Sequence, residues 1–325
     1  TIDWQNHINV ASGATLTVTG TSKFHDADYS GSGGAFYNNG TVVLNGDVVF
    51  DNSTADYGGA FRNEGIFTIN GFATVTNNKG KTGAAISNRG TATLNGGGLF
   101  EGNTTRQESG AATANAGSMI FNATTDPNVN YTFKKNTSGQ ESGAILNKKG
   151  GTITFNADAI FENNSVTADP KTNLSGGAIF NKGTLNFYGS SYSFKGNTTG
   201  GVLNDIRNDG VMNVGVAGNT TNFNISYVTG TGTTNILGTV NLNAANAEKT
   251  IDWQNHINVA SGATLTVSDA ADFKNGTAED GGALNVRQNG KAEFNGVTSF
   301  KGNHGNNNGG YFAARRLPSG FRRVE

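Results

Sequence analysis

Apolar and polar residues alternate over short stretches along most of this 325-residue chain. In Thr152-Ile153-Thr154-Phe155, for example, threonine precedes each large apolar residue, and Thr91-Ala92-Thr93-Leu94 has the same order. A period of two residues indicates β-strands that bury one face. No apolar period typical of a helix extends over ten or more residues, and the many Gly and Asn residues disfavour helices. The pattern therefore predicts an all-β protein.

The alternating stretches belong to a repeated unit. Each unit begins with Gly-Gly-Ala-apolar, continues through an alternating strand that ends in Asn-Gly, and closes on a short apolar run that ends in Phe, with Asn about three residues later. The second residue of the Gly-Gly-Ala element falls at positions 34, 59, 84, 110, 143, 177, 201 and 282. A near-constant step of about 25 residues predicts a solenoid, in which each unit buries its apolar face against its neighbours.

Three short strands per unit predict a parallel β-helix of about 12 or 13 rungs, with equivalent residues stacked about 4.8 Å apart. One inward ladder is expected to contain Phe50, Val75, Phe100, Phe133, Phe161, Phe194 and Phe300. A second is expected to contain Phe36, Phe61, Ile86, Ile145, Ile179, Leu203 and Leu284. Two residues beyond it, a ladder of buried amides is expected at Asn38, Asn63, Asn88, Asn147 and Asn181, because buried amides need hydrogen-bond partners.

One segment of 18 residues, 1–18, recurs identically at 250–267. We therefore divide a single β-helix over 1–312 into five parts. They are opening rungs (1–32), regular repeats (33–215), looser Thr- and Asn-rich rungs (216–249), the duplicated segment (250–267) and further repeats (268–312). Residues 313–325 form a basic tail that matches no repeat, and we interpret it as a cloning-derived tail, a cap or a linker.

Composition narrows the class of partner. Only 14% of the residues are charged and the net charge is -1, which argues against nucleic acid or an acidic membrane surface. The absence of Cys excludes disulfides and thiolate metal sites. The sequence contains no apolar run of 18 residues, so no transmembrane helix is predicted. Thr1-Ile2-Asp3-Trp4 does not start a signal peptide, so we expect a fragment or a mature form.

Two paired signatures support a family resemblance. Gly176-Gly177-Ala178-Ile179 and the Phe-x-x-Asn element, as in Phe161 to Asn164, look like the repeats of chlamydial polymorphic membrane proteins. More widely, the chain is similar to the passenger domains of bacterial autotransporters and adhesins. This resemblance implies a right-handed β-helix, export to the cell surface of a bacterium with an outer membrane, and adhesion. The C-terminal β-barrel translocator of those families has no counterpart in this sequence.

Catalytic and metal-binding chemistry is sparse. The four histidines are scattered, and no Ser/His/Asp or His-x-x-x-His spacing occurs, so neither an enzyme nor a cofactor is expected. Asp26, Asp28 and Ser30 place oxygen ligands at alternate positions, as a calcium loop begins. The closing Glu is missing, because Tyr37 occupies its place. A plain turn with exposed Asp residues is the alternative interpretation.

The parallel β-helix also occurs in polysaccharide lyases and hydrolases, which need two or three carboxylates on neighbouring rungs. Here acidic residues fall at expected corners, and only Asp56 and Glu108 could align vertically. Sequences of the type Asn-x-Ser/Thr are interpreted as corner asparagines rather than glycan acceptors. They occur at Asn52, Asn103, Asn136, Asn197 and Asn219, among others.

Two insertions break the repeat, at 124–130 and 168–174, and each contains a proline. They are predicted to bulge from rung corners. The candidate binding residues are Asp126, Asn128, Asn130, Asp169, Lys171 and Asn173. We expect an adhesive surface solenoid whose partner is a host surface protein or glycan. The alternatives are that the insertions are neutral, and that the protein is a polysaccharide-active enzyme or a carbohydrate-binding protein of the phage-tailspike type.

Overall fold

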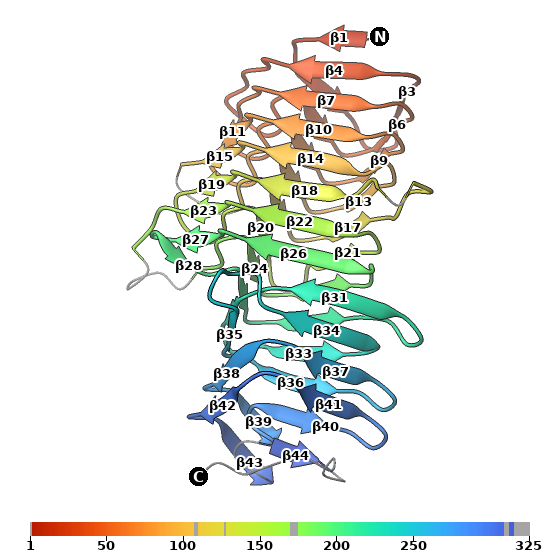
Figure 1. Ribbon diagram of the computed structural model, residues 1–325. Coiled ribbons are helices and arrows are strands. Elements are labelled where there is room, and N and C mark those ends of the chain that lie inside the picture. Colours follow the sequence, from red (N-terminus) through yellow and green to blue (C-terminus); the bar gives the residue numbers. More distant parts are fainter. Residues whose placement is uncertain (1, 107–109, 127, 170–174, 309–311, 315–325) are drawn as a thin grey trace.

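The computed structural model describes all residues except 1, 107–109, 127, 170–174, 309–311 and 315–325. Three long parallel sheets, each with twelve strands, run the length of the chain and enclose one core. Figure 1 shows the strands stacked as successive rungs from the N-terminus to the C-terminal repeats. The predicted parallel β-helix is therefore confirmed. No helix in the described part of the chain could cross a membrane.

The rungs follow a fixed order of sheets. Sheet A contains β1 (Ile2–Trp4), β4 (Ser22–His25), β7 (Val48–Asp51), β10 (Ala73–Thr76), β14 (Gly98–Glu101), β18 (Tyr131–Lys134), β22 (Ala159–Glu162), β26 (Ser191–Lys195), β31 (Thr220–Asn224), β34 (Thr239–Asn243), β37 (Thr264–Val267) and β41 (Lys291–Phe294). Sheet B contains β2 (Ile8–Val10), β5 (Phe36–Asn38), β8 (Phe61–Asn63), β12 (Ile86–Asn88), β16 (Thr113–Asn115), β20 (Ile145–Asn147), β24 (Ile179–Asn181), β29 (Ile206–Asn208), β32 (Tyr227–Thr229), β35 (Thr250–Trp253), β38 (Ala270–Lys274) and β42 (Thr298–Lys301).

Sheet C completes each rung and contains β3 (Thr15–Val18), β6 (Thr41–Leu44), β9 (Ile66–Ile69), β13 (Thr91–Leu94), β17 (Ser118–Phe121), β21 (Thr152–Phe155), β25 (Thr184–Phe187), β30 (Val211–Val214), β33 (Thr233–Ile236), β36 (His256–Val259), β40 (Leu284–Val286) and β44 (Phe312–Ala314). A short sheet D lies between sheets A and B along the chain, and contains β11 (Lys79–Gly80), β15 (Thr104–Thr105), β19 (Thr137–Ser138), β23 (Ser165–Val166), β27 (Thr198–Thr199) and β28 (Val202–Leu203). Strand β39 (Thr277–Asp280) pairs with β43 (His304–Asn308).

Aromatic rings fill the core in two columns. On sheet A, Phe133 and Phe161 stack with ring centroids 4.9 Å apart, and Phe194 continues the column 4.7 Å from Phe161. On sheet C, Phe121 and Phe155 stack at 4.4 Å. The two columns meet edge to face, a favourable arrangement for aromatic rings. The inward assignment of Phe50, Val75, Phe100, Phe133, Phe161 and Phe194 is thus confirmed.

The Gly-Gly-Ala element is explained by crowding at the turn that leads into sheet B. Gly33 has a φ of +73°, and a Cβ atom there would lie 1.8 Å from the carbonyl oxygen of Phe36. At Gly34 a Cβ would lie 1.9 Å from the carbonyl oxygen of Gly59 in the next rung. Only glycine avoids both the clash and the strain of a positive φ. Ala35, which follows, is buried in the core.

Three positions in the predicted ladders are wrong. Leu203 lies in β28, the antiparallel end of sheet D, and its side chain is exposed; Ile206 takes the inward position beneath Ile179. Phe300 and Leu284 lie in sheets B and C, not in the sheets of the ladders to which they were assigned. The errors at 284 and 300 have the same cause, a displacement of the later strands by one sheet.

The duplicated segment occupies a different part of the rung in each copy. Residues 2–4, 8–10 and 15–18 form strands of sheets A, B and C, whereas 251–253, 257–259 and 264–267 belong to sheets B, C and A. The looser segment 216–249 contains four strands, β31 to β34, which make one rung plus one strand of sheet A. Every element after residue 250 is therefore displaced by one sheet relative to the regular repeats.

Candidate functional site

The two predicted binding loops lie at different corners. The loop with Asp126, Asn128 and Asn130 follows sheet C and precedes sheet A, whereas the insertion with Asp169 lies between sheets D and B. In Figure 1 the segment after β17 and the segment after β23 project on opposite sides of the stack. The structure therefore does not bring the described candidates, Asp126, Asn128, Asn130 and Asp169, together into one site.

The first loop is closed on itself. The carboxylate of Asp126 accepts hydrogen bonds from the backbone N and the side-chain Nδ2 of Asn128, at 2.9 and 3.0 Å. The Thr124 hydroxyl donates to the Asp126 carbonyl oxygen at 2.7 Å. The side chain of Asn130 accepts from the Thr132 hydroxyl. In the second loop, Asp169 is exposed, while Lys171 and Asn173 lie outside the described residues. Binding at either loop stays a prediction.

Of the calcium candidate Asp26, Asp28 and Ser30, the side chain of Asp26 is engaged in other contacts. Asp26 Oδ2 lies 2.6 Å from His25 Nδ1, and Asp26 Oδ1 accepts from Asn52 Nδ2 at 2.6 Å. His25 Nε2 lies 2.5 Å from Asp3 Oδ1 on β1. The hydrogen bonds to Asp26 and Asp3 raise the pKa of His25, and those from Asn52 and His25 lower the pKa of Asp26. Within the described ranges, no three His, Cys, Asp or Glu side chains are grouped to hold a metal ion.

Of the two carboxylates considered for catalysis, only Asp56 lies within the described residues. Asp56 Oδ2 forms an ion pair with Lys81 Nζ at 3.0 Å, and Glu108 lies outside the described residues. The predicted vertical alignment of these two groups is therefore untested.

One carboxylate that the sequence did not single out is buried. Asp205 occupies the place in the register that alanine holds in the preceding rung, because Ala178 precedes Ile179 as Asp205 precedes Ile206. Its Oδ1 accepts from Asn197 Nδ2 at 3.0 Å, and its Oδ2 accepts from the backbone N atoms of Ser226 and Tyr227. Burial raises the pKa of Asp205, and the three hydrogen bonds oppose that rise.

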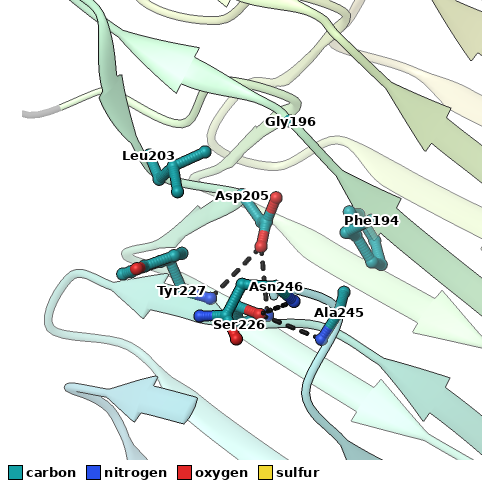
Figure 2. A pocket seen from close by; sticks show the side chains of 8 residues that line it. All are labelled: Phe194, Gly196, Leu203, Asp205, Ser226, Tyr227, Ala245 and Asn246. Carbon is teal, nitrogen blue, oxygen red and sulfur yellow. Dashed lines mark hydrogen bonds between the residues drawn. The ribbon is translucent and has the colours of Figure 1, made fainter. Parts of the chain in front are cut away.

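Figure 2 shows Asp205 above a small cavity that is also lined by Leu203, Ser226 and Tyr227. The cavity measures about 20 Å³, roughly the space of one water molecule. No room for a substrate exists there. Asp205 instead ends a chain of buried amides, which runs from Asn78 through Asn103, Asn136 and Asn164 to Asn197, with Nδ2 to Oδ1 distances near 3.0 Å. This chain is here called the second Asn ladder.

Asn103, Asn136 and Asn197 lie at corners between sheets A and D, as expected from the sequence, and the second Asn ladder directs their side chains into the core. Asn103, Asn136 and Asn197 are fully buried, so their amides cannot carry glycans while the protein is folded. Each Nδ2 also donates to a backbone carbonyl oxygen, as Asn164 does to that of Phe133 at 2.8 Å. The spacing Phe-x-x-Asn was the available signal, because it precedes four of the five asparagines of the ladder, with Val75 in place of Phe before Asn78.

The predicted first Asn ladder is confirmed and is longer than expected. It joins Asn38, Asn63, Asn88, Asn115, Asn147, Asn181 and Asn208 through Nδ2 to Oδ1 hydrogen bonds of 2.7 to 2.9 Å. Both buried ladders donate toward the C-terminus. They hold successive rungs in register and leave the outer surfaces as the places where a partner could bind.

The outer surface of sheet C is the most regular of these surfaces. Two rows of outward side chains run along it, from β3 to β33, and together they are called the C face. One row contains Thr15, Thr41, Ile66, Thr91, Ser118, Thr152, Thr184, Val211 and Thr233. The other contains Thr17, Val43, Thr68, Thr93, Ile120, Thr154, Asn186, Asn213 and Asn235.

The C face has no charged side chain. Its residues are spaced about 4.8 Å between rungs and about 6.6 Å along a strand. Six of the first seven residues of one row are Thr or Ser, and the other row ends in hydrogen-bonded amides, with Asn213 Nδ2 donating to Asn186 Oδ1 at 2.8 Å. Sheet A differs, because its outer surface includes Glu101 and Lys134, whose charged atoms are 3.2 Å apart. The C face is therefore suited to a neutral, hydroxyl-rich or amide-rich partner.

No protein-family model, curated protein or solved structure matches this chain. The choice among functions consequently depends on the surfaces described above.

Proposed function

We propose that this chain is an adhesin-like solenoid displayed on a bacterial cell surface, of the kind found in autotransporter passenger domains. The C face carries the proposal. It supplies a long, flat, uncharged array of hydrogen-bonding groups on a rigid scaffold, and β-branched Thr residues have little rotational freedom to lose on binding. A host glycan or a neutral protein surface is the partner that fits such chemistry. The fold itself does not specify a function, so the argument depends on this surface.

Binding can be tested with beads coated with the parent protein or with variants, applied to a glycan array and to epithelial cells. In the first variant Thr93 and Thr154 on the C face are both replaced by Lys. The matched control places Lys at Thr74 and Ser193, which are outward, half-buried residues of sheet A. We expect the C-face variant to lose binding and the sheet A control to retain it, with unchanged thermal unfolding in both.

A third variant distinguishes the C face from the predicted loop. Shortening the loop between Asn122 and Asn130 removes Asp126 and Asn128 but leaves the C face intact. Loss of binding in this variant alone would transfer the function to the loop. Retention of binding by all three variants would refute the proposal for both surfaces. Surface display is tested separately, by protease treatment and antibody labelling of intact cells of the source bacterium.

A further inference from the structure

The structure distinguishes among the Asn-Gly bonds of the chain, which are chemically the most prone to spontaneous deamidation. In that reaction the backbone nitrogen of Gly attacks the side-chain Cγ of Asn, a C–N bond forms, and ammonia leaves from Nδ2. Water then opens the cyclic imide to give aspartate or isoaspartate. Glycine favours the attack because it has no side chain to obstruct it. Asn-Gly occurs at Asn39, Asn45, Asn70, Asn95, Asn275, Asn289, Asn295 and Asn308.

At three of these bonds the attacking atom, the backbone nitrogen of Gly, already donates a hydrogen bond. The backbone N–H of Gly40 donates to Asn38 Oδ1 at 3.0 Å, that of Gly276 to Asn303 Oδ1 at 2.9 Å, and that of Gly290 to the Arg287 carbonyl oxygen at 2.8 Å. Attack from these nitrogens first requires the hydrogen bond to break. Asn39, Asn275 and Asn289 are therefore protected through the residue that follows each of them.

Three others belong to a ladder of exposed or half-buried amides at the corner between sheets C and A, here called the outer Asn ladder. Asn70 Nδ2 donates to Asn45 Oδ1 at 2.8 Å, and Asn95 Nδ2 donates to Asn70 Oδ1 at 2.7 Å. Asn122 and Asn156 continue it in the same way. Each amide after the first thus has its leaving nitrogen held by the preceding rung.

Asn45 is the exception, because it ends the outer Asn ladder. It is exposed, its Oδ1 accepts from Asn70, and neither its Nδ2 nor the N–H of Gly46 donates a hydrogen bond within the described residues. A donor on the carbonyl oxygen stabilises the negative charge that develops there when nitrogen attacks. Asn45 therefore combines an activated carbonyl with a free leaving group and a free nucleophile.

We propose that Asn45 is a site of spontaneous deamidation and that the outer Asn ladder protects Asn70 and Asn95. In the aspartate product the reaction limits itself, because an aspartate at position 45 still accepts from Asn70 and does so more strongly as a charged acceptor. The amide of Asn70 is then held more tightly than before. The ladder gains one negative charge at its N-terminal end, close to the exposed Asp47, and the reaction does not spread along it.

The parent protein is incubated in mildly alkaline buffer, and peptide mapping by mass spectrometry follows each Asn-Gly site over time. We expect Asn45 to react about 3- to 10-fold faster than Asn70 and Asn95, the effect of one hydrogen bond on a rate. Asn295 is exposed and its Gly296 N–H donates to no described residue, so it serves as an internal reference outside the ladder.

The decisive variant is Asn45→Ala, which leaves the exposed corner intact but frees the amide of Asn70. The fast site should then move by one rung to Asn70, while Asn95 stays slow and the rate at Asn295 is unchanged. Asn45→Asp should instead slow Asn70 further. Equal rates at Asn45, Asn70 and Asn95 in the parent, or an unchanged rate at Asn70 in Asn45→Ala, would overturn the proposal.

Discussion

Trp4 and Trp253 occupy the same position of an identical 18-residue sequence, yet they have opposite environments. Trp4 lies on sheet A over Phe24 and is 44% exposed, whereas Trp253 lies on sheet B over Phe273 and is 2% exposed. Strand β32 covers the second copy on its N-terminal side, and β1 has a neighbour on only one side. The burial of each Trp is therefore determined by the rung stacked on it and not by its local sequence.

This pair permits a comparison in which the local sequence is constant. Trp253→Ala should lower the free energy of unfolding by about 3–5 kcal/mol, because it leaves a cavity in a packed core. Trp4→Ala should cost less than about 1 kcal/mol, since the exposed ring loses little burial. Urea unfolding followed by circular dichroism measures both. Similar costs at the two positions would contradict the assignment of the duplicated segment to different environments.

Phe161 tests the aromatic column. Its ring lies between those of Phe133 and Phe194, and neither can move along the axis to fill a gap. We expect Phe161→Ala to destabilise the protein by about 3–5 kcal/mol. Thr93→Ala, on the C face, should stay within about 0.5 kcal/mol of the parent in the same denaturant titration. If the Thr93 variant lost as much stability as the Phe161 variant, the inward and outward assignment would be wrong.

The Asn ladders allow a matched test of burial. Asn164 is buried, donates to Asn197 Oδ1 and to the Phe133 carbonyl oxygen, and accepts from Asn136. Its replacement by Ala leaves these buried groups unpaired, so a loss of about 1–3 kcal/mol or more is expected. Asn95→Ala in the outer Asn ladder removes hydrogen bonds of the same kind, but water can replace them, and the loss should be near zero. Thermal unfolding of the two variants provides the measurement. Equal shifts in melting temperature would show that burial does not determine how much an Asn ladder stabilises the protein.

His25 should make the docking of β1 depend on pH. The pKa of His25 is raised above 6.5, so the imidazolium favours the folded state; its contribution is complete below about pH 6.5 and is lost as pH rises through the folded pKa. The pKa of Asp26 is lowered from 3.8, so its contribution is present above about pH 4 and is lost as pH falls through its folded pKa. Lys23 opposes the charge on His25.

Amide hydrogen exchange in β1, corrected for the intrinsic effect of pH, provides the measurement from about pH 5 to 8. Protection of β1 should decrease with rising pH in the parent and should be flat in His25→Gln, which can keep hydrogen bonds but cannot titrate. An identical pH profile in this variant would assign the effect to another group.

The sequence was sufficient to predict the features that depend on period. Alternation in strands such as Thr152–Phe155 identifies which residues face inward, and the place of Asn two residues after the apolar residue of each Gly-Gly-Ala element was enough to predict the first Asn ladder. Alternation does not identify the sheet, however. The sheet to which a strand belongs depends on how many strands separate it from the preceding repeats. The Thr- and Asn-rich segment before residue 250 lacks the repeated unit, so its strands cannot be counted from the sequence.

The candidate sites were predicted less well, for a related reason. Gly200-Gly201-Val202-Leu203 resembles the repeated element, but both glycines adopt positive φ and turn the chain back as the antiparallel strand β28. Its place in the rung passes to Asp205 and Ile206, so a carboxylate enters the core where the pattern predicts alanine. The partners of Asp205 come from its own rung, at Asn197, and from the next rung, at Ser226 and Tyr227, and no local motif relates them.

The one-sheet displacement after residue 250 also affects what a ligand would encounter. Thr15 and Thr17 point outward from sheet C, but their duplicates Thr264 and Thr266 point outward from sheet A. The outward threonines of the two copies thus face different directions around the axis of the solenoid. A flat surface that binds one copy cannot bind the other at the same time, whereas two separate ligands can approach the same epitope from two sides.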